Sequence, residues 1–290
     1  LTIGNQWAGG NPALTNLDGL DNLASIGGGM ELWNNPLLNN LSGLNSLTSI
    51  GGDILFWGNI ALTSLSGLSN VNSLGGGLGI HFCSSLSDLI GLDGLTSIPG
   101  EFYLSNNNSL TSLVGLDNLT AFGSYVTIGS INNGNQSLAS LAGIEKLTSI
   151  GASLDISSNH LLNSLSGLEN LTSIGGSLWI TDNSSLTDIV QLENLKSLGD
   201  RLYISGNPLL TSLSGLDSIN AGSITNLTIF YNSSLSTCEV KSICDYLAAP
   251  NGTVDISNNA PGCNNPEEVA KACESSSIEV IPVEDGISVF

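Results

Sequence analysis

The stretch that decides the fold is Leu165 to Asp188, LSGLENLTSIGGSLWITDNSSLTD, because most of the chain consists of copies of it. Its apolar residues, at positions 165, 168, 171, 174, 178, 180 and 186, recur in the neighbouring copies. The first residue of the copy recurs every 24 residues, apart from one four-residue insertion, at Leu17, Leu41, Leu65, Leu89, Leu113, Leu141, Leu165, Ile189 and Leu213. A fixed period of this size predicts a solenoid whose stacked coils share one continuous core.

Each copy contains one segment with the alternation of a strand. The L-x-I segment at Leu178 to Ile180 alternates apolar and variable residues, as a strand with one buried face does. We expect it to be the only strand in the coil, because the other leucines recur every three residues and suit 3₁₀ turns or extended corners. Glycine pairs such as Gly27–Gly28 precede the strand, where a corner requires positive φ or a close backbone approach.

An asparagine follows each strand, and stacking would place these side chains in register. The series is Asn35, Asn59, Asn107, Asn159, Asn183, Asn207, Asn232 and Asn259, with Asn11 and Asn135 after longer loops. We expect the amides to donate and accept hydrogen bonds between coils and to satisfy backbone groups at the corner. Cys83 takes this place in one coil, and we predict a buried, unreactive thiol there.

The string L-x-x-I-G-G-x-L-x-I-x-x-N-x-x-L resembles leucine-rich repeats, and NLTSIGGSLWI at 170–180 is most similar to the receptor L domain. The resemblance covers about residues 1–260. It implies a mainly β fold: a right-handed, single-stranded β-solenoid of about ten 24-residue coils with a disulfide-bonded helical C-terminal cap. The ligand does not follow from this resemblance, because one fold serves many binding roles.

Charge and hydropathy limit the partners of the chain. Only 5 Lys and Arg residues stand against 25 Asp and Glu residues, which gives a net charge of −20. Nucleic acids and anionic membrane surfaces are therefore excluded as expected partners. Since no run of about 18 apolar residues occurs, we expect no membrane insertion. The chain begins within a strand-like segment, Leu1 to Ile3, which suggests numbering that starts after processing or trimming.

The composition divides the chain into a repeat solenoid at 1–237, a Cys-rich cap at 238–274 and a tail at 275–290. A solenoid must seal the open apolar end of its core, and the cap occupies that end. Within the cap we predict a short amphipathic helix over 238–247, one more strand over 253–256 and a second helix over 266–273.

Four of the five cysteines lie in this cap. Cys238 and Cys263 are 25 residues apart, and Cys244 and Cys273 are 29 apart, about one coil each. Because equivalent positions of stacked coils fall within disulfide reach, we predict these two disulfides, while two other pairings stay open. A zinc site is the rival interpretation, although the spacing lacks the short C-x₂-C segments that such sites favour.

The cap sequence CEVKSICDYLAAPNGTVDISNNAPGC also resembles the cap of repeat proteins that Gram-negative bacteria secrete by the type IX route. Ser275 to Ser277 begins a linker-like tail, and EDGISVF at 284–290 is similar to the lead-in of a sorting domain. The resemblance implies a secreted protein or one on the outer cell surface, exported by the type IX machinery.

Two groups of aromatic and histidine residues occupy outward positions of the predicted sheet. The N-terminal group is Trp33, Trp57, His81, Phe82 and Tyr103, and the C-terminal group is Trp179, Tyr203, Phe230 and Tyr231. The coils between them carry small or acidic residues, namely Thr127, Gly129, Asp155 and Ser157. The rings either stack in ladders that shield the sheet or form a face that binds a glycan or a protein.

A polar column precedes each strand: Asp21, Asn45, Ser69, Asp93, Asp117, Glu145, Glu169, Glu193 and Asp217. Like charges one coil apart repel each other unless they are screened or bridged. We favour a solvated acidic edge over calcium bridging, because stacked carboxylates alone lack a ligand-rich loop. No other cofactor is expected, and the alternative calcium ligands are Glu145, Glu169, Glu193 and Asp217.

Two loops after strands are lengthened, Gly4–Gly10 with Trp7 and Ser130–Gly134. Such loops often carry binding contacts, but neither contains a charge, and we favour tolerated insertions.

Catalysis is not expected. His81 and His160, the two histidines, lie in different repeats, so no Ser/His/Asp set can close. Asp155 and Asp182 form the nearest pair of outward carboxylates, without a basic neighbour on that face. The sequence therefore predicts a non-enzymatic binding module or adhesin, with a structural spacer or filament subunit as the alternative.

Overall fold

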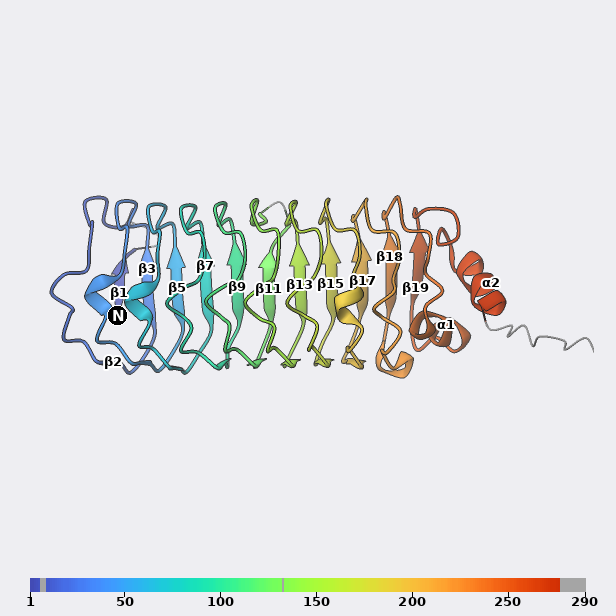
Figure 1. Cartoon of the computed structure of the whole chain (residues 1–290), viewed down its shortest axis with the longest axis horizontal. Helices are drawn as coiled ribbons and strands as arrows, with labels where there is room; N and C mark the ends of the chain where they lie inside the picture. The colour runs from blue at the N-terminus through green and yellow to red at the C-terminus, as the bar shows by residue number, and fades with distance from the viewer. Residues whose placement is uncertain (6–8, 132, 277–290) are drawn as a thin grey trace, which may run out of the picture.

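The computed structural model describes residues 1–5, 9–131 and 133–276, which form an elongated stack of coils with two helices at its C-terminal end (Figure 1). In these residues one strand per coil contributes to an eleven-stranded parallel sheet, which we call the main sheet. Its strands are β1 (Thr2–Gly4), β3 (Met30–Trp33), β5 (Ile54–Trp57), β7 (Leu78–His81), β9 (Phe102–Ser105), β11 (Val126–Gly129), β13 (Leu154–Ser157), β15 (Leu178–Thr181), β17 (Leu202–Ser205), β18 (Leu227–Phe230) and β19 (Val254–Ser257).

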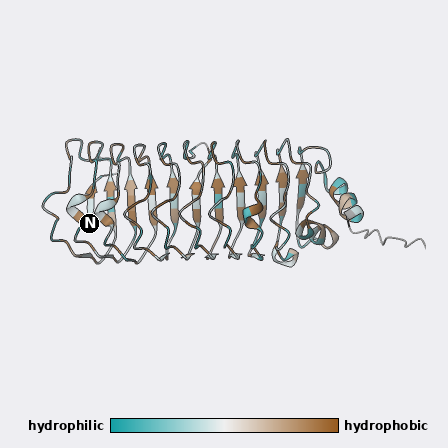
Figure 2. Cartoon of the chain, viewed as in Figure 1, coloured by the Kyte–Doolittle hydropathy of each residue, from teal (hydrophilic) through white to brown (hydrophobic). Residues whose placement is uncertain are grey.

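The 24-residue period sets the register of the main sheet. Leu178 pairs with Leu154 on one side and Leu202 on the other, and Ile180 pairs with Ile156 and Ile204 in the same way. The recurring apolar residues are buried in one continuous core, apart from a few such as Leu20 and Leu23 of the first repeat, which are partly buried, and the hydrophobic colour recurs on the strands along the whole stack (Figure 2). The predicted β-solenoid of about ten coils is therefore confirmed.

The expectation of one strand per coil was wrong, because a two-residue segment before the corner also pairs. These short strands form a three-stranded and a five-stranded parallel sheet within the described residues. They are β2 (Ser25–Ile26), β4 (Ser49–Ile50), β6 (Ser73–Leu74), β8 (Ser97–Ile98), β10 (Ala121–Phe122), β12 (Ser149–Ile150), β14 (Ser173–Ile174) and β16 (Ser197–Leu198). Identical extended segments in register expose matching N–H and C=O groups to each other, so the stacking itself pairs them.

The glycine pairs serve a close backbone approach and not a positive φ. A Cβ atom on Gly51 would lie 2.4 Å from the carbonyl oxygen of Gly27, and one on Gly75 would lie 2.3 Å from that of Gly51. The expected 3₁₀ turns occur in four coils of the described chain: η1 (Ser42–Leu44), η2 (Ser66–Leu68), η3 (Val190–Leu192) and η4 (Ala221–Ser223).

The asparagine ladder is confirmed, and the repeating unit is visible at Asn159. The Oδ1 atom of Asn159 accepts two hydrogen bonds from Asn135, one from its backbone N–H at 3.1 Å and one from the side-chain Nδ2 of Asn135 at 3.2 Å. The Nδ2 of Asn159 donates to the carbonyl of Ile128 in the preceding strand at 2.9 Å. The side chain of Asn159 therefore satisfies both an N–H and a carbonyl of the preceding coil.

Cys83 replaces one asparagine of the ladder, as predicted. Its thiol is free and fully buried, and burial raises its pKa to about 12. Hydrogen bonds from Asn59 to Cys83 partly offset this effect on the pKa. The N–H of Cys83 donates to Asn107 Oδ1 at 3.0 Å, so the ladder continues through this coil. A buried thiol with so high a pKa is unreactive at neutral pH.

The cap contains α1 (Lys241–Ala248) and α2 (Pro266–Ser276), and the two predicted disulfides are present: one joins the two helices and the other joins the segments that precede them. Cys238 is bonded to Cys263, and Cys244 to Cys273, each with its Cα atoms 5.6 Å apart. The predicted helix starting at residue 238 begins three residues later, at Lys241. The second helix begins at residue 266 as predicted and extends three residues beyond 273.

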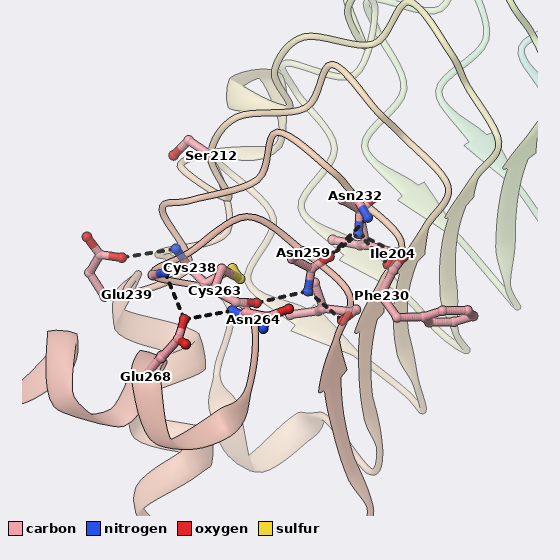
Figure 3. Close-up of a disulfide and its surroundings, with 12 residues drawn as sticks. Ile204, Ser212, Phe230, Asn232, Cys238, Glu239, Asn259, Cys263, Asn264 and Glu268 are labelled. Carbon is pink, nitrogen blue, oxygen red and sulfur yellow. Dashed lines mark hydrogen bonds between the residues drawn. A yellow bond between two sulfur atoms is a disulfide. The ribbon is translucent and has the colours of Figure 1, made fainter.

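The ladder and the first disulfide meet at Cys263 (Figure 3). Asn259 Nδ2 donates to the carbonyl of Cys263 at 2.9 Å, so the last amide of the ladder ends on a disulfide-bonded residue. The N–H of Glu268 donates to Asn265 Oδ1, and the Glu268 carboxylate accepts N–H bonds from Gly262 and Asn264. The N–H groups of Gly262 and Asn264 hold the pKa of Glu268 below its usual range, and Asn265 Oδ1 caps the start of α2.

The ladder generates a test in two directions. Asn159→Ala removes the side-chain hydrogen bonds to the N–H of Asn135 and to the carbonyl of Ile128, and we expect a loss of about 2–5 kcal/mol of stability. Cys83→Asn restores the missing amide, and we expect a gain of about 1 kcal/mol. Urea unfolding followed by circular dichroism measures both, with Cys83→Ala as the control for loss of the thiol. A Cys83→Asn variant less stable than Cys83→Ala would contradict this account of the ladder.

Candidate binding face

The main sheet gathers the N-terminal group of outward side chains into one patch. Trp33 and Trp57 lie with ring centroids 5.8 Å apart, and Trp57 lies 4.9 Å from His81 and 5.0 Å from Phe82. His81 lies 6.2 Å from Tyr103 in the next coil. This set, the N-terminal aromatic patch, is continuous over β3 to β9.

The C-terminal group forms a second patch on the same sheet. Trp179 and Tyr203 lie 4.4 Å apart, Tyr203 meets the edge of Phe230 at 5.5 Å, and Phe230 lies 5.1 Å from Tyr231. The guanidinium of Arg201 lies 5.6 Å from the ring centroid of Trp179. We call this set the C-terminal aromatic patch. The structure thus brings together all nine residues in the two groups expected from the sequence.

The residue directly after each main-sheet strand adopts the left-handed conformation in most coils. The φ values are 53° at Asn34, 71° at Gly58, 55° at Phe82, 59° at Asn106, 58° at Ser158, 57° at Asp182, 68° at Gly206, 56° at Tyr231 and 56° at Asn258. Seven of these nine residues are Asn, Gly, Asp or Ser, which suit tight turns. Phe82 and Tyr231 are the exceptions, and a bulky aromatic residue in this region is strained.

Both strained residues are exposed. Phe82 is 38% exposed and Tyr231 is 61% exposed, so Tyr231 in particular keeps most of its surface in contact with solvent. The sequence contains the signal for this feature, because both residues align with the Asn, Gly and Asp residues of the other turns.

A hollow of about 520 Å³ lies between the two patches. Asp155 pairs with Thr127 and Trp179 in register, so a short side chain stands beside the indole ring. Ile131, 74% exposed, and Tyr125 also line the hollow. The sequence predicted a tolerated insertion at Ser130–Gly134, but Ile131 of this loop lines a cavity on the sheet.

A chain of hydrogen bonds crosses the floor of this hollow. The hydroxyl of Ser157 donates to the carboxylate of Asp155 and also lies 2.7 Å from the hydroxyl of Thr181. Burial raises the pKa of Asp155, and the bond from Ser157 partly offsets that rise. No Lys, Arg or His stands among the described residues that line the hollow. Its chemistry is therefore that of hydroxyls, two carboxylates and aromatic rings.

A smaller hollow of about 340 Å³ lies in the N-terminal aromatic patch, over Gly79. His81 and Tyr103 line it together with the carboxylate residues Asp53 and Glu101. His81 Nδ1 lies 2.8 Å from the hydroxyl of Ser105, and burial lowers the pKa of His81 to about 4. The imidazole is therefore neutral at physiological pH and behaves as one more ring of the patch.

The polar column has a structural role that the sequence analysis did not foresee. The N–H of Gly143 donates to Glu145 at 3.0 Å, and that of Gly167 donates to Glu169 at 2.8 Å. The same bond occurs at Asp21, Asp93 and Asp117. These glycines have φ values from 97° to 116°. The acidic side chains therefore cap left-handed turns, which explains why they recur despite their mutual repulsion.

The calcium alternative at Glu145, Glu169, Glu193 and Asp217 stays a prediction. Within the residues described, no group of three or more His, Cys, Asp or Glu side chains is arranged to hold a metal ion.

The lengthened loop at Gly4–Gly10 lies partly outside the described residues, and Trp7 is one of the residues not described. No helix in the described part of the chain is long and apolar enough to cross a membrane.

Comparisons with known proteins add little to this geometry. No family model matches the chain, and no curated protein matches it. Among solved structures the chain is similar to one described as "Crystal structure of TLR13-ssRNA13 complex", at 16% identity and a TM-score of 0.23. The match covers 85% of this chain and 46% of that chain, so this chain spans less than half of its length. With so low a TM-score, the strand pairing described above remains the basis of the fold assignment.

The lowered pKa of His81 predicts a pH dependence of stability. As pH falls from about 6.5, the unfolded chain takes up a proton that the folded chain does not accept until about pH 4. Stability is therefore lost across this interval, and His81→Gln removes that part of the loss. We expect the wild-type melting temperature to fall relative to that of His81→Gln between pH 7.5 and pH 5.

The exposed His160 provides the matched control for that experiment. His160→Gln makes the same substitution at the other histidine of the sequence and so controls for the exchange of histidine for glutamine. Equal pH profiles for wild type and His81→Gln would refute the account of His81.

The strain at Phe82 predicts an inverted order of stability. Glycine normally destabilises a protein by about 0.5–1 kcal/mol relative to alanine, but alanine keeps the Cβ atom that the left-handed turn disfavours. Phe82→Gly should therefore be more stable than Phe82→Ala, by about 1 kcal/mol. Urea unfolding of the two variants, and of the same pair at Tyr231, measures the difference. The usual order, with alanine more stable, would show that the aromatic residue is not strained.

Proposed function

We propose that this chain is a non-enzymatic binding module or adhesin that acts outside the cell and holds a glycan or protein ligand against the aromatic face of its main sheet. The observation that carries the proposal is the left-handed conformation of the exposed Phe82 and Tyr231. Each belongs to one of the two aromatic patches.

The alternative explanation, in which the rings only shield the sheet, does not account for these two residues. Asn or Gly at the same position of other coils makes the turn without strain. The left-handed conformation costs an L-residue about 1–2 kcal/mol, and a ring contact recovers about 0.5–1.5 kcal/mol. At Tyr231, which is 61% exposed, burial adds little to this balance, so a benefit outside folding stability accounts better for the aromatic residue there. Ligand binding is such a benefit.

The net charge of the chain restricts the class of ligand. With a net charge of −20, the chain repels nucleic acids and anionic surfaces. Exposed rings on a rigid sheet suit the apolar faces of sugar rings and the side chains of a protein partner. Asp155 and Asp182 line one hollow among hydroxyl groups and aromatic rings, and the Asp155 carboxylate accepts a hydrogen bond from Ser157.

The cap supports a location outside the cell. The two disulfides in the described chain are typical of proteins in oxidising compartments, because reducing agents in the cytosol keep cysteine thiols reduced. Export by the type IX machinery rests on the resemblance of the cap sequence. The segment at 284–290 that is similar to a sorting-domain lead-in lies outside the described residues.

The test compares two substitutions in the patches with one outside them. The double variant Phe82→Asn, Tyr231→Asn keeps the turn, since Asn stands at this position in three other coils. We expect it to weaken binding on glycan arrays or to cell surfaces by about tenfold or more. Leu161→Asn changes an exposed leucine in the turn beyond β13 and should leave binding unchanged.

The structural alternative, a spacer or filament subunit, predicts a different result. Under that alternative the double variant would bind as wild type does, and light scattering would reveal assemblies larger than one chain. Unchanged binding by the double variant would therefore contradict the proposed function. Monomers at all concentrations would contradict the alternative.

A further inference from the structure

The hollow beside Trp179 has the shape of a ligand site. Thr127 and Asp155 stand at paired positions of β11 and β13, and Ser157 and Thr181 stand at paired positions of β13 and β15. These short side chains leave a gap in a face that is covered by rings on both sides. The volume of about 520 Å³ lies within the range of about 300–1,000 Å³ of small-ligand sites.

The floor of the hollow offers unused hydrogen-bonding capacity. In the described part of the chain, Ser157 is the hydrogen-bond partner of the Asp155 carboxylate, which can accept about four bonds. Ser157 is only 2% exposed and passes the chain of hydrogen bonds on to Thr181. Burial without a basic partner raises the pKa of Asp155, so the carboxylate lacks compensation that ligand donors would supply.

The lining selects the class of ligand. Eight of the thirteen lining residues carry a hydroxyl group, and none is Lys, Arg or His. An anionic ligand would meet the carboxylates of Asp155 and Asp182, and a purely apolar ligand would bury the carboxylate and the hydroxyls without hydrogen bonds. A ligand with several hydroxyls and one apolar face satisfies both the floor and the indole ring.

A cationic ligand is the main competitor, because aromatic rings and carboxylates also attract cations. Arg201 argues against it, since its guanidinium already lies 5.6 Å from the ring centroid of Trp179. A second cation on the same ring would meet that positive charge. A neutral ligand avoids this repulsion.

The geometry points to a binding site for a neutral sugar ring, with the ring stacked on Trp179 and its hydroxyls donating to Asp155. This inference rests on the proposed function and names the ligand class of one place on the same face. Ser157 and Thr181 hold the carboxylate in position, and Ile131 lines the hollow as part of the lengthened loop.

The experiment uses the full chain and four probes: neutral tetrasaccharides of glucose, galactose and mannose, and the cationic tetrasaccharide of glucosamine. Titration calorimetry should detect at least one neutral probe, with an affinity that changes less than about twofold between 50 and 500 mM NaCl. Asp155→Ala should weaken this binding by about 10- to 100-fold. Asp155→Asn, which keeps an acceptor, should weaken it less.

A second variant guards against indirect effects. Thr127→Tyr extends the row of rings from Tyr103 and fills the hollow without removing any contact of the core. It should abolish binding of the neutral probe while the melting temperature stays within a few degrees of wild type. Circular dichroism of each variant establishes that the fold is retained.

The outcomes separate this inference from the proposed function. Binding of a neutral probe that survives both Asp155→Ala and Thr127→Tyr but is lost in the Phe82→Asn, Tyr231→Asn variant overturns the site and leaves the function standing. Preference for the cationic probe, with equal loss in Asp155→Asn and Asp155→Ala, also overturns it. Failure of all probes overturns the site, whereas cell-surface binding that survives the double variant overturns the proposed function.

Discussion

Every coil must turn after its main-sheet strand, and the turn leaves backbone N–H and C=O groups facing the core. The buried asparagine of the next coil accepts from one of these N–H groups and donates to a carbonyl of the preceding strand, as Asn159 does for Asn135 and Ile128. Because unsatisfied buried polar groups are costly, this ladder holds the coils in one register. The register in turn aligns every other column of the sheet.

A fixed register makes the outward columns independent of the core. Thr127, Asp155 and Trp179 stand at the same position of successive coils, yet they are a hydroxyl, a carboxylate and an indole. The leucines and asparagines stabilise each coil in the same way, so these outward positions are free to differ. A gap in the aromatic cover therefore arises from side-chain size alone, without an interruption of the backbone.

The sequence was sufficient for features that recur or that come in matched pairs. The leucine period predicted the coils, the asparagine series predicted the ladder, and the spacing of Cys238 and Cys263 predicted a disulfide. The sequence was insufficient for strands of only two residues, such as Ser25–Ile26, because so short a strand shows no alternation of apolar and polar residues. The hollow was missed because Thr127 was noted as a small residue and not as the wall of a cavity.

The strained turns link the constraint of the fold to the use of the face. The ladder sets the position of the residue after each strand, and this residue adopts a left-handed turn in most coils. A chain selected for stability alone would keep Asn or Gly there, as it does at Asn34 and Gly58. Phe82 and Tyr231 depart from that rule at the two places where aromatic rings gather. The same backbone that specifies the solenoid thus places its two strained residues in the two aromatic patches of the proposed binding face.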